Sequence, residues 1–181
     1  MIRSPLAIAA LALTLLVSGC SNRSIGNSID DKLLDPDVRS AVQKASPDLT
    51  SPTSHIVVSS YNGIVLLAGQ TPREELKQTA EKAANSVQGV KKVYNELQIL
   101  PPTSLIARSN DSLLTAQIKA EMLANSNVPS TNIKVITENG IVYMLGLVTR
   151  QEAQSAAQVV QGVSGVQTVS YTHLRAHETD S

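Results

Sequence analysis

The sequence predicts an α+β fold of two similar α-β-β-α-β units, each a small mixed sheet backed by two helices. The first observation behind this prediction is a stretch that occurs twice, as SYNGIVLLAG over residues 60–69 and as TENGIVYMLG over residues 137–146. Its Asn-Gly pairs are a strong hairpin signal, because both central residues of a type I′ turn need a positive φ. The second observation is that the spacing between the copies persists beyond each hairpin, at Arg73 with Arg150. Such persistence indicates an internal duplication.

The length of 181 residues accommodates two small domains, and the duplication favours that division. We expect the first domain over residues 30–100 and the second over residues 110–170, with a linker over residues 101–109. There is no Phe or Trp and there are four Tyr, so the interior must be built from Val, Ile, Leu and Ala. These side chains bury less area than aromatic ones, and the sequence therefore predicts no pocket for a bulky cofactor.

Residues 1–19 have the pattern of a secretory signal peptide. Arg3 supplies the positive start, a long apolar run follows, and Ser18-Gly19 provides the small residues that precede a cleavage site. The apolar run is too short to cross a bilayer of about 30 Å comfortably as a helix. The segment is therefore not predicted to be a membrane span.

Cys20 is the only cysteine, and it follows Val17-Ser18-Gly19 directly. This arrangement resembles a bacterial lipobox, in which the cysteine is the first mature residue and carries lipid. The alternatives for a lone secreted cysteine are a reactive thiol and an intermolecular disulfide. Acyl chains contribute about 0.8 kcal/mol per buried CH₂, so a multiply acylated Cys20 would hold the chain on a membrane. Ser21 stands where lipoproteins kept at the inner membrane typically carry Asp, and this resemblance implies the outer membrane.

In the first unit, residues 20–29 are polar and are expected to form a flexible tether. A helical pattern then opens at Asp30, and Pro36 is expected to interrupt it before the helix ends near Ala45. Thr71-Pro72-Arg73-Glu74 is predicted to be a capping box that starts the next helix. The two hairpin strands are nearly continuous apolar runs, so either both faces of the sheet are covered within the chain or one face meets a partner. The expected strands span residues 55–59, 64–68 and 90–100.

The second unit repeats this order. A helix is expected from Asn110 or Asp111 to about Asn125. Thr149-Arg150-Gln151-Glu152 is again a capping box, for a helix that ends near Gln161. The expected strands span residues 132–137 and 141–147, and a last strand begins at Val166.

The charges of the chain are balanced, with 15 Lys and Arg against 15 Asp and Glu. Such a chain has no long-range field to attract polyanions, so nucleic acid is not predicted as a partner. Nucleophilic catalysis needs a base that a third group orients, and His55, the only histidine outside residues 171–181, is expected to be structural. His173 and His177 have a metal-compatible spacing but lie in or beside a suspect tail, so no metal is assigned. The sequence thus predicts no enzyme, no cofactor and no small-molecule substrate.

The first helix of the second unit carries two apolar stripes at helical spacing. Leu114, Ile118 and Met122 form one stripe, which can pack on the unit's own sheet. The other stripe either packs against the first unit or forms a surface for lipid, with cations close enough to meet phosphates. Charge favours this helix as the lipid site over the first helix of the chain, which holds several Asp. The candidate phospholipid-binding residues are Leu113, Ala116, Lys119, Ala120, Leu123 and Arg108.

The Asn-Gly tips, the glycines that follow them at Gly69 and Gly146, and the VQGV and VSGV segments before the third strands resemble the BON domain family (bacterial OsmY and nodulation). The resemblance covers about Asp30 to Val169, and two such units behind a lipobox are similar to dual-BON outer-membrane lipoproteins. It implies a lipid-anchored protein on the periplasmic face of the outer membrane that binds anionic phospholipid and supports envelope integrity. The alternative is an adapter for an envelope assembly factor, such as the outer-membrane β-barrel assembly machinery.

The segment after Val169 departs from the family's pattern, because its apolar alternation breaks. Residues 171–181 resemble translated vector sequence. We expect a non-native tail there, from which no function is inferred.

Overall fold

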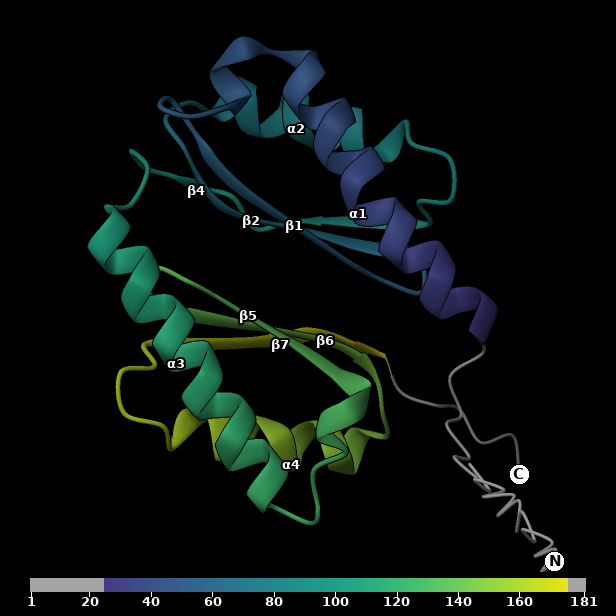
Figure 1. The fold of residues 1–181 in the computed structure, drawn as a ribbon, viewed down its shortest axis with the longest axis vertical. Coiled ribbons are helices and arrows are strands. Elements are labelled where there is room, and N and C mark those ends of the chain that lie inside the picture. The colour runs from purple at the N-terminus through teal and green to yellow at the C-terminus, as the bar shows by residue number, and fades with distance from the viewer. Residues whose placement is uncertain (1–24, 176–181) are drawn as a thin grey trace, which may run out of the picture.

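The structure is a computed structural model that describes residues 25–175, and it contains the two expected α-β-β-α-β units. The predicted α+β class is therefore confirmed (Figure 1). The first unit consists of α1 (Ile25–Ala45), the 3₁₀ helix η1 (Pro47–Leu49), β1 (His55–Tyr61), β2 (Ile64–Thr71), α2 (Glu74–Asn85), β3 (Lys92–Asn95) and β4 (Gln98–Ile99). The second unit consists of α3 (Leu105–Ala124), the 3₁₀ helix η2 (Ser130–Asn132), β5 (Ile133–Glu138), β6 (Ile141–Leu147), α4 (Arg150–Gln161) and β7 (Thr168–Arg175).

Each sheet is built on a hairpin. β1 pairs with β2 antiparallel, and β3 and β4 pair with β2 in parallel. In the second unit β5 pairs with β6 antiparallel, and β7 pairs with β6 in parallel. The tip residues have positive φ, 52° and 78° at Asn62 and Gly63 and 53° and 73° at Asn139 and Gly140. Such values belong to type I′ turns, so both predicted Asn-Gly tips are confirmed.

The two helices of each unit pack on one face of its sheet. In the first unit Val42 of α1 and Leu67 of β2 belong to one buried cluster. In the second unit Met122 of α3 and Met144 of β6 occupy the corresponding places. Burial of a side chain of this size contributes about 1.5–3 kcal/mol, so these contacts hold the helices on the sheets.

The other faces of the two sheets pack against each other. Leu66 and Ala68 of β2 meet Tyr143 and Leu145 of β6 in a third buried cluster, together with Tyr61. The molecule therefore has four layers, in the order helices, sheet, sheet, helices (Figure 1). Every residue of β2 is buried. The strand is an almost continuous apolar run because the helices cover one of its faces and the second unit covers the other.

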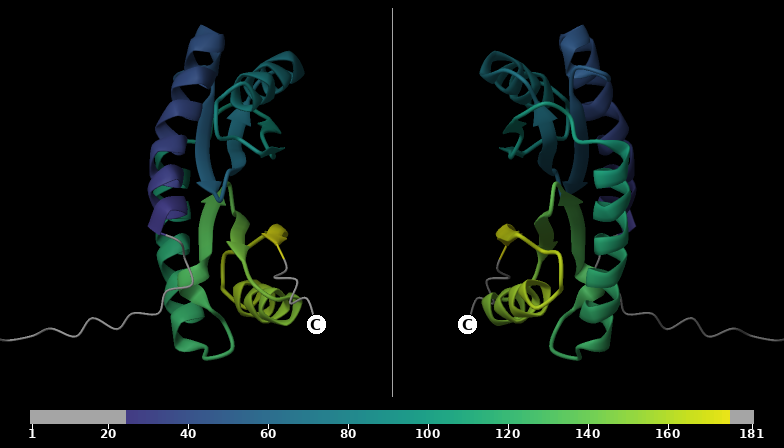
Figure 2. Two further views of the ribbon diagram at one scale, coloured as in Figure 1. Left: turned by 90° about the vertical axis from the view of Figure 1, so that its right-hand side faces the viewer. Right: turned by 90° about the vertical axis from the view of Figure 1, so that its left-hand side faces the viewer.

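Polar contacts border the apolar centre of this interface. The Nε2 atom of His55 lies 3.5 Å from Oε2 of Glu138, and the Nζ atom of Lys134 lies 3.8 Å from a carboxylate oxygen of Asp35. Each pair joins one unit to the other. Figure 2 shows the consequence of the stacking for the helices, because α1 and α3 lie along one side of the molecule and α2 and α4 along the other.

The helix α1 differs from its prediction at two places. It begins at Ile25, within the expected tether, and it continues through Pro36 without interruption. A proline inside a helix costs about 3 kcal/mol, whereas the burial of Val38 and Val42 on the sheet contributes about 1.5–3 kcal/mol each. Tertiary packing therefore outweighs the local signal.

The predicted capping box of α2 is wrong. The helix begins at Glu74 with Arg73 as its N-cap, and no side chain caps it. Thr71 is fully buried at the end of β2, and its hydroxyl is hydrogen-bonded to that of Ser54 at 3.0 Å, so it is not available as a cap. The corresponding box at Thr149 is present in full.

Two boundaries in the second unit also differ. α3 begins at Leu105, several residues early, because Oγ of Ser104 accepts a hydrogen bond from the N–H of Ala107 at 3.2 Å and caps the helix. β7 continues to Arg175 after a register shift, so the last strand enters the expected tail. Residues 176–181 lie outside the described part of the chain.

Candidate functional site

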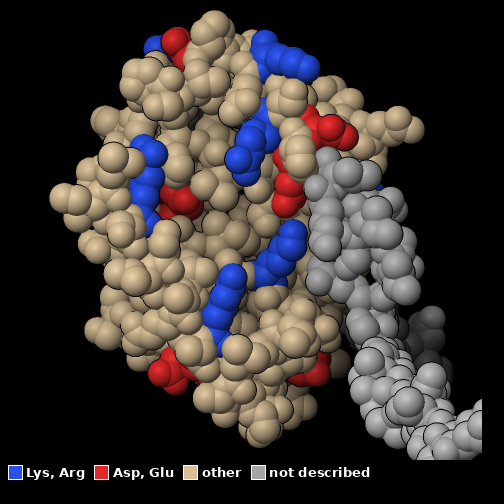
Figure 3. Space-filling model, viewed as in Figure 1, with Lys and Arg blue, Asp and Glu red and all other residues tan. Residues whose placement is uncertain are grey.

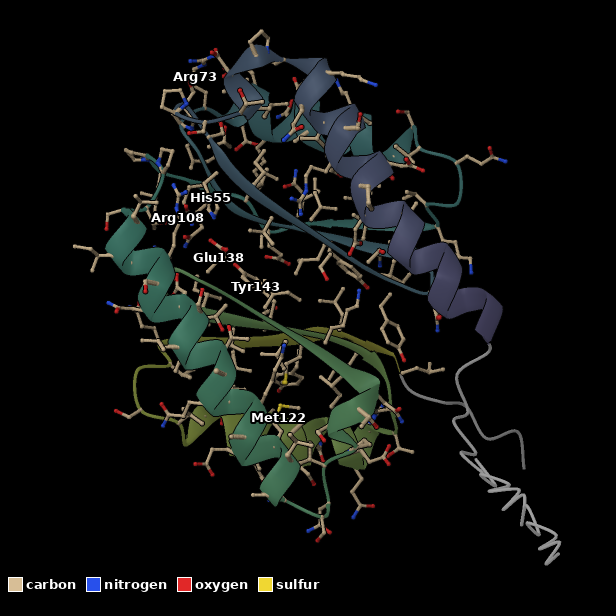
Figure 4. All side chains as sticks on the ribbon, in the orientation of Figure 1. His55, Arg73, Arg108, Met122, Glu138 and Tyr143 are labelled. Atoms are coloured by element: carbon tan, nitrogen blue, oxygen red, sulfur yellow. The ribbon has the colours of Figure 1, made fainter. Side chains whose placement is uncertain are left out.

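The buried face of α3 is the first of the two predicted stripes. Ile118 and Met122 are fully buried, and Leu114 packs beside them as a partly buried side chain. Figure 4 shows Met122 on the side of α3 that faces the sheet. The prediction that this stripe is core is confirmed.

The opposite face of α3 exposes large apolar side chains. Leu113 and Leu123 are each 69% exposed, and Leu105 and Ile106 at the start of the helix are 80% and 76% exposed. At 100° per residue the exposed apolar positions fall within roughly 100° of arc, so they form one continuous surface. We call this surface the α3 stripe, and its members are Leu105, Ile106, Leu113, Ala116, Ala120 and Leu123.

The exposure of the α3 stripe rules out one of the two interpretations of the sequence. The interpretation in which this face packs against the first unit is wrong, because all its members are solvent-exposed. Leu105 and Ile106 were missed, since a linker was expected over residues 101–109. The signal that could have found them is Ser104, a residue type favoured at helix N-caps, directly before an apolar pair in phase with the stripe.

Charged side chains border the α3 stripe. Lys119 is exposed on one flank and Glu121 on the other. Arg108 is on the flank of Lys119 but is half-buried. Of the two predicted cations, Lys119 is therefore the one fully available beside the stripe. Figure 3 shows the side of the molecule on which α1 and α3 lie, where uncharged residues form most of the surface and charges of both signs are scattered over it.

Asp111 has a role that the sequence analysis did not foresee. It is only 7% exposed, and its carboxylate accepts hydrogen bonds from the backbone N–H groups of Asn139 at 2.8 Å and Gly140 at 2.9 Å. Hydrogen bonds to an ionised group are stronger than neutral ones, so this carboxylate ties α3 to the tip of the β5–β6 hairpin. Glu121 is left as the only exposed acidic side chain of α3.

The titratable groups between the two units do not form a catalytic set. His55 faces Glu138 in an ion-pair position, which fits the structural role predicted for it. Burial raises the pKa of Tyr143 to about 12, and the charges of Glu96 and Glu138 add to the shift. A phenol with so high a pKa stays protonated at neutral pH and provides no base there. Residues 25–175 contain no group of three or more His, Cys, Asp or Glu side chains arranged to hold a metal.

None of the helices within residues 25–175 combines the length and the apolar content needed to cross a membrane. The predicted signal peptide over residues 1–19, the lipidation site Cys20 and His177 all lie outside the described residues. Lipidation therefore stays a prediction.

Comparisons with known proteins agree with the duplication. The chain matches the BON domain family over residues 30–101 and 110–176. It is 42% identical over 147 residues to the outer membrane lipoprotein DolP of Haemophilus influenzae, which covers 81% of this chain and 75% of that protein. It is 37% identical over 147 residues to a 21 kDa hemolysin of Actinobacillus pleuropneumoniae, with the same coverage of 81% and 75%. The osmotically-inducible protein Y of Escherichia coli is 32% identical over 152 residues, covering 81% of this chain and 74% of that protein.

Proposed function

Because the chain belongs to the BON domain family, we propose that it is a non-enzymatic, lipid-anchored protein that binds anionic phospholipid through the α3 stripe and supports outer-membrane integrity. Its place is the periplasmic face of that membrane. The relative from Haemophilus influenzae is named as an outer membrane lipoprotein, and this supports both the proposed location at the outer membrane and the proposed lipid anchor. The observation that carries the binding proposal is the exposure of Leu105, Ile106, Leu113 and Leu123 on one face of α3.

Apolar burial is the larger contribution to this binding. A fully buried Leu or Ile contributes about 1.5–3 kcal/mol, so half of that from four side chains amounts to about 3–6 kcal/mol. One lysine near an anionic surface contributes about 1 kcal/mol. The helix α3 therefore has the character of an interfacial helix, with the α3 stripe toward the acyl chains and Lys119 at the level of the phosphates.

The position of α3 in the fold suits this role. Figure 2 shows the helix along an outer side of the molecule. The Asp111 carboxylate holds the helix against the hairpin tip. The stripe is thus presented by a helix whose orientation is set before any membrane contact.

Vesicle co-sedimentation tests the proposal. The unlipidated polypeptide from Ser21 onward should bind vesicles with anionic phospholipid more tightly than vesicles of phosphatidylcholine alone. Leu113→Asp should weaken binding to anionic vesicles about tenfold or more, which is 1.4 kcal/mol, and it should leave the fold intact because Leu113 is exposed.

Gln158→Asp is the matched control for this variant. It adds the same charge at an exposed position of α4, outside the α3 stripe, and it should leave binding within about twofold of the parent. If Leu113→Asp unfolded the protein while the folded fraction still bound vesicles, the lipid site would have to lie elsewhere.

The anchor at Cys20 has a separate test. Metabolic labelling with a radioactive fatty acid should mark the parent chain and leave Cys20→Ala unlabelled, and the variant should fractionate as soluble or as uncleaved precursor. A parent chain that takes up no label and is washed from membranes by salt would contradict anchoring.

A second candidate function is an adapter for an envelope assembly factor, such as the outer-membrane β-barrel assembly machinery. The α3 stripe favours this candidate as well, since an amphipathic helix face is also a common element for docking into a protein groove. The vesicle experiment separates the two candidates. An adapter should ignore both vesicle compositions, whereas a lipid binder should prefer the anionic one.

A further inference from the structure

A hollow of about 440 Å³ lies beside the α3 stripe, between α3, the tip of the β5–β6 hairpin and the turn before β7. Leu113 belongs both to the stripe and to the lining of this hollow, so the two surfaces are continuous. The polar side chains of the lining are Asn110, Asp111, Gln117, Asn139, Ser164 and Gln167.

This polar lining is uncharged apart from Asp111, whose carboxylate is already bonded to the hairpin tip. The side chains of Asn110, Gln117, Ser164 and Gln167 are exposed, and they make no hydrogen bond to any described residue. An amide offers both a donor and an acceptor, which are the two functions of a hydroxyl group. The described lining contains no Lys or Arg that could pair with a phosphate. The hollow is thus suited to a neutral group that carries hydroxyls.

The first unit provides an internal comparison. Lys91 occupies the position of Gln167, because each donates its backbone N–H to the carbonyl of the glycine at its hairpin tip, at 2.8 and 2.9 Å. In each unit a leucine of the first helix lies beside the glycine of the turn that precedes the third strand. Counted from that leucine, Asp37 in the first unit occupies the position of Gln117 in the second. The same framework therefore carries charges in the first unit and amides in the second. The neutral hollow is a property of the second unit and not of the fold.

We propose that this hollow binds the uncharged, hydroxyl-bearing part of a lipid head group, a glycerol or a sugar, while the α3 stripe contacts the acyl region. The proposal rests on the membrane contact proposed above and adds a head-group preference to it. When α3 lies in the membrane plane with Leu113 toward the acyl chains, the hollow is at one flank of the helix, at the depth of the head groups. Lys119 is on the opposite flank, so the phosphate that it meets belongs to a different lipid molecule from the one whose head group enters the hollow.

Vesicles that differ only in head-group hydroxyls test this proposal. Phosphatidylglycerol and phosphatidylpropanol carry the same charge, but the propanol head group has no hydroxyl. The polypeptide from Ser21 onward should bind phosphatidylglycerol vesicles about 2- to 10-fold more tightly, which is the effect expected from one net hydrogen bond.

Variants of the lining locate the preference. Gln117→Ala and Gln167→Ala should each lower the ratio of the two affinities toward one, and thermal melts should show that both variants fold. Gln158→Ala, on α4 and outside the hollow, is the matched control and should keep the parent ratio. A preference that survived in both lining variants would overturn the proposal.

The other outcomes of the vesicle experiment distinguish a failure of the head-group proposal from a failure of the proposed membrane contact. Equal binding of the parent to the two vesicles would overturn the head-group preference and leave the membrane contact standing. No binding to either vesicle would overturn both. If free glycerol shifted the side-chain amide NMR signals of Gln117 and Gln167 as strongly as the same concentration of phosphatidylglycerol in vesicles, the ligand would be a soluble polyol and the lipid assignment would be wrong.

Discussion

The Asp111 carboxylate is buried and accepts two backbone N–H groups from the tip of the β5–β6 hairpin. In Asp111→Ala both N–H groups lose their acceptor, and an unsatisfied buried polar group costs about 1–3 kcal/mol. The free energy of unfolding, measured by urea denaturation, should fall by about 2–5 kcal/mol. Asp111→Asn keeps one acceptor and should lie between the parent and the alanine variant. A loss below about 0.5 kcal/mol in Asp111→Ala would show that the carboxylate does not stabilise the contact.

Gly140 is a second residue whose role is local geometry. Its φ is +73°, and a Cβ atom there would lie 2.7 Å from Nε2 of Gln167. Gly140→Val places a β-branched side chain in the left-handed region and should cost at least about 1 kcal/mol. Gly63→Val, at φ +78° in the first unit, should behave alike. Thermal melts check both variants, and an unchanged melting temperature in either variant would contradict the geometric role of the glycine.

At the level of elements, α3 combines an apolar stripe with a cation that projects beside it. Lys119→Glu should weaken vesicle binding more at low salt than at high salt, because the Debye length falls from about 30 Å at 0.01 M to about 3 Å at 1 M. Co-sedimentation at two salt concentrations measures the difference. Lys82→Glu is the control, since Lys82 is exposed on α2, at the other side of the molecule (Figure 2). Equal effects of the two variants would mean that net charge matters and that the position of Lys119 does not.

At the level of the whole molecule, the stacked sheets bury Tyr143 between the units (Figure 4). Its pKa is raised to about 12 in the folded protein, against an ordinary value of 10.0. Between these values the unfolded chain releases this proton and the folded protein keeps it. The free energy of unfolding should therefore fall as the pH rises above 10, by up to about 2–3 kcal/mol near pH 12.

Tyr143→Phe removes this proton and tests the linkage. Urea denaturation between pH 8 and pH 11.5 should give a shallower decline for the variant than for the parent. The other tyrosines and the lysines titrate in both proteins, so the difference between the two curves isolates Tyr143. Parallel curves would contradict the raised pKa.

Much of the fold was predictable because its signals are local. The Asn-Gly tips need a positive φ at both residues, and few other sequences satisfy that need. The capping box at Thr149 and the buried stripe through Ile118 likewise depend on neighbours within one or two helical turns. The start of α3 was missed although its signal, the cap at Ser104, is local. Other predictions failed where a distant contact competed with the local signal. Thr71 does not cap α2, because it is buried at the end of β2 and bonded to Ser54.

The candidate site shows the same division. The sequence by itself determined the duplication, the fold class and the helix that carries a second apolar stripe, because repeats and periodicity are properties of the chain in order. Only the tertiary structure decided that this stripe is exposed and that Asp111 is buried. The physical reason is that an apolar helix face predicts only that burial of this face is favourable, and not which surface buries it. Which distant segment covers it depends on how the two sheets stack, and here they bury β2 on both faces and leave α3 uncovered on one.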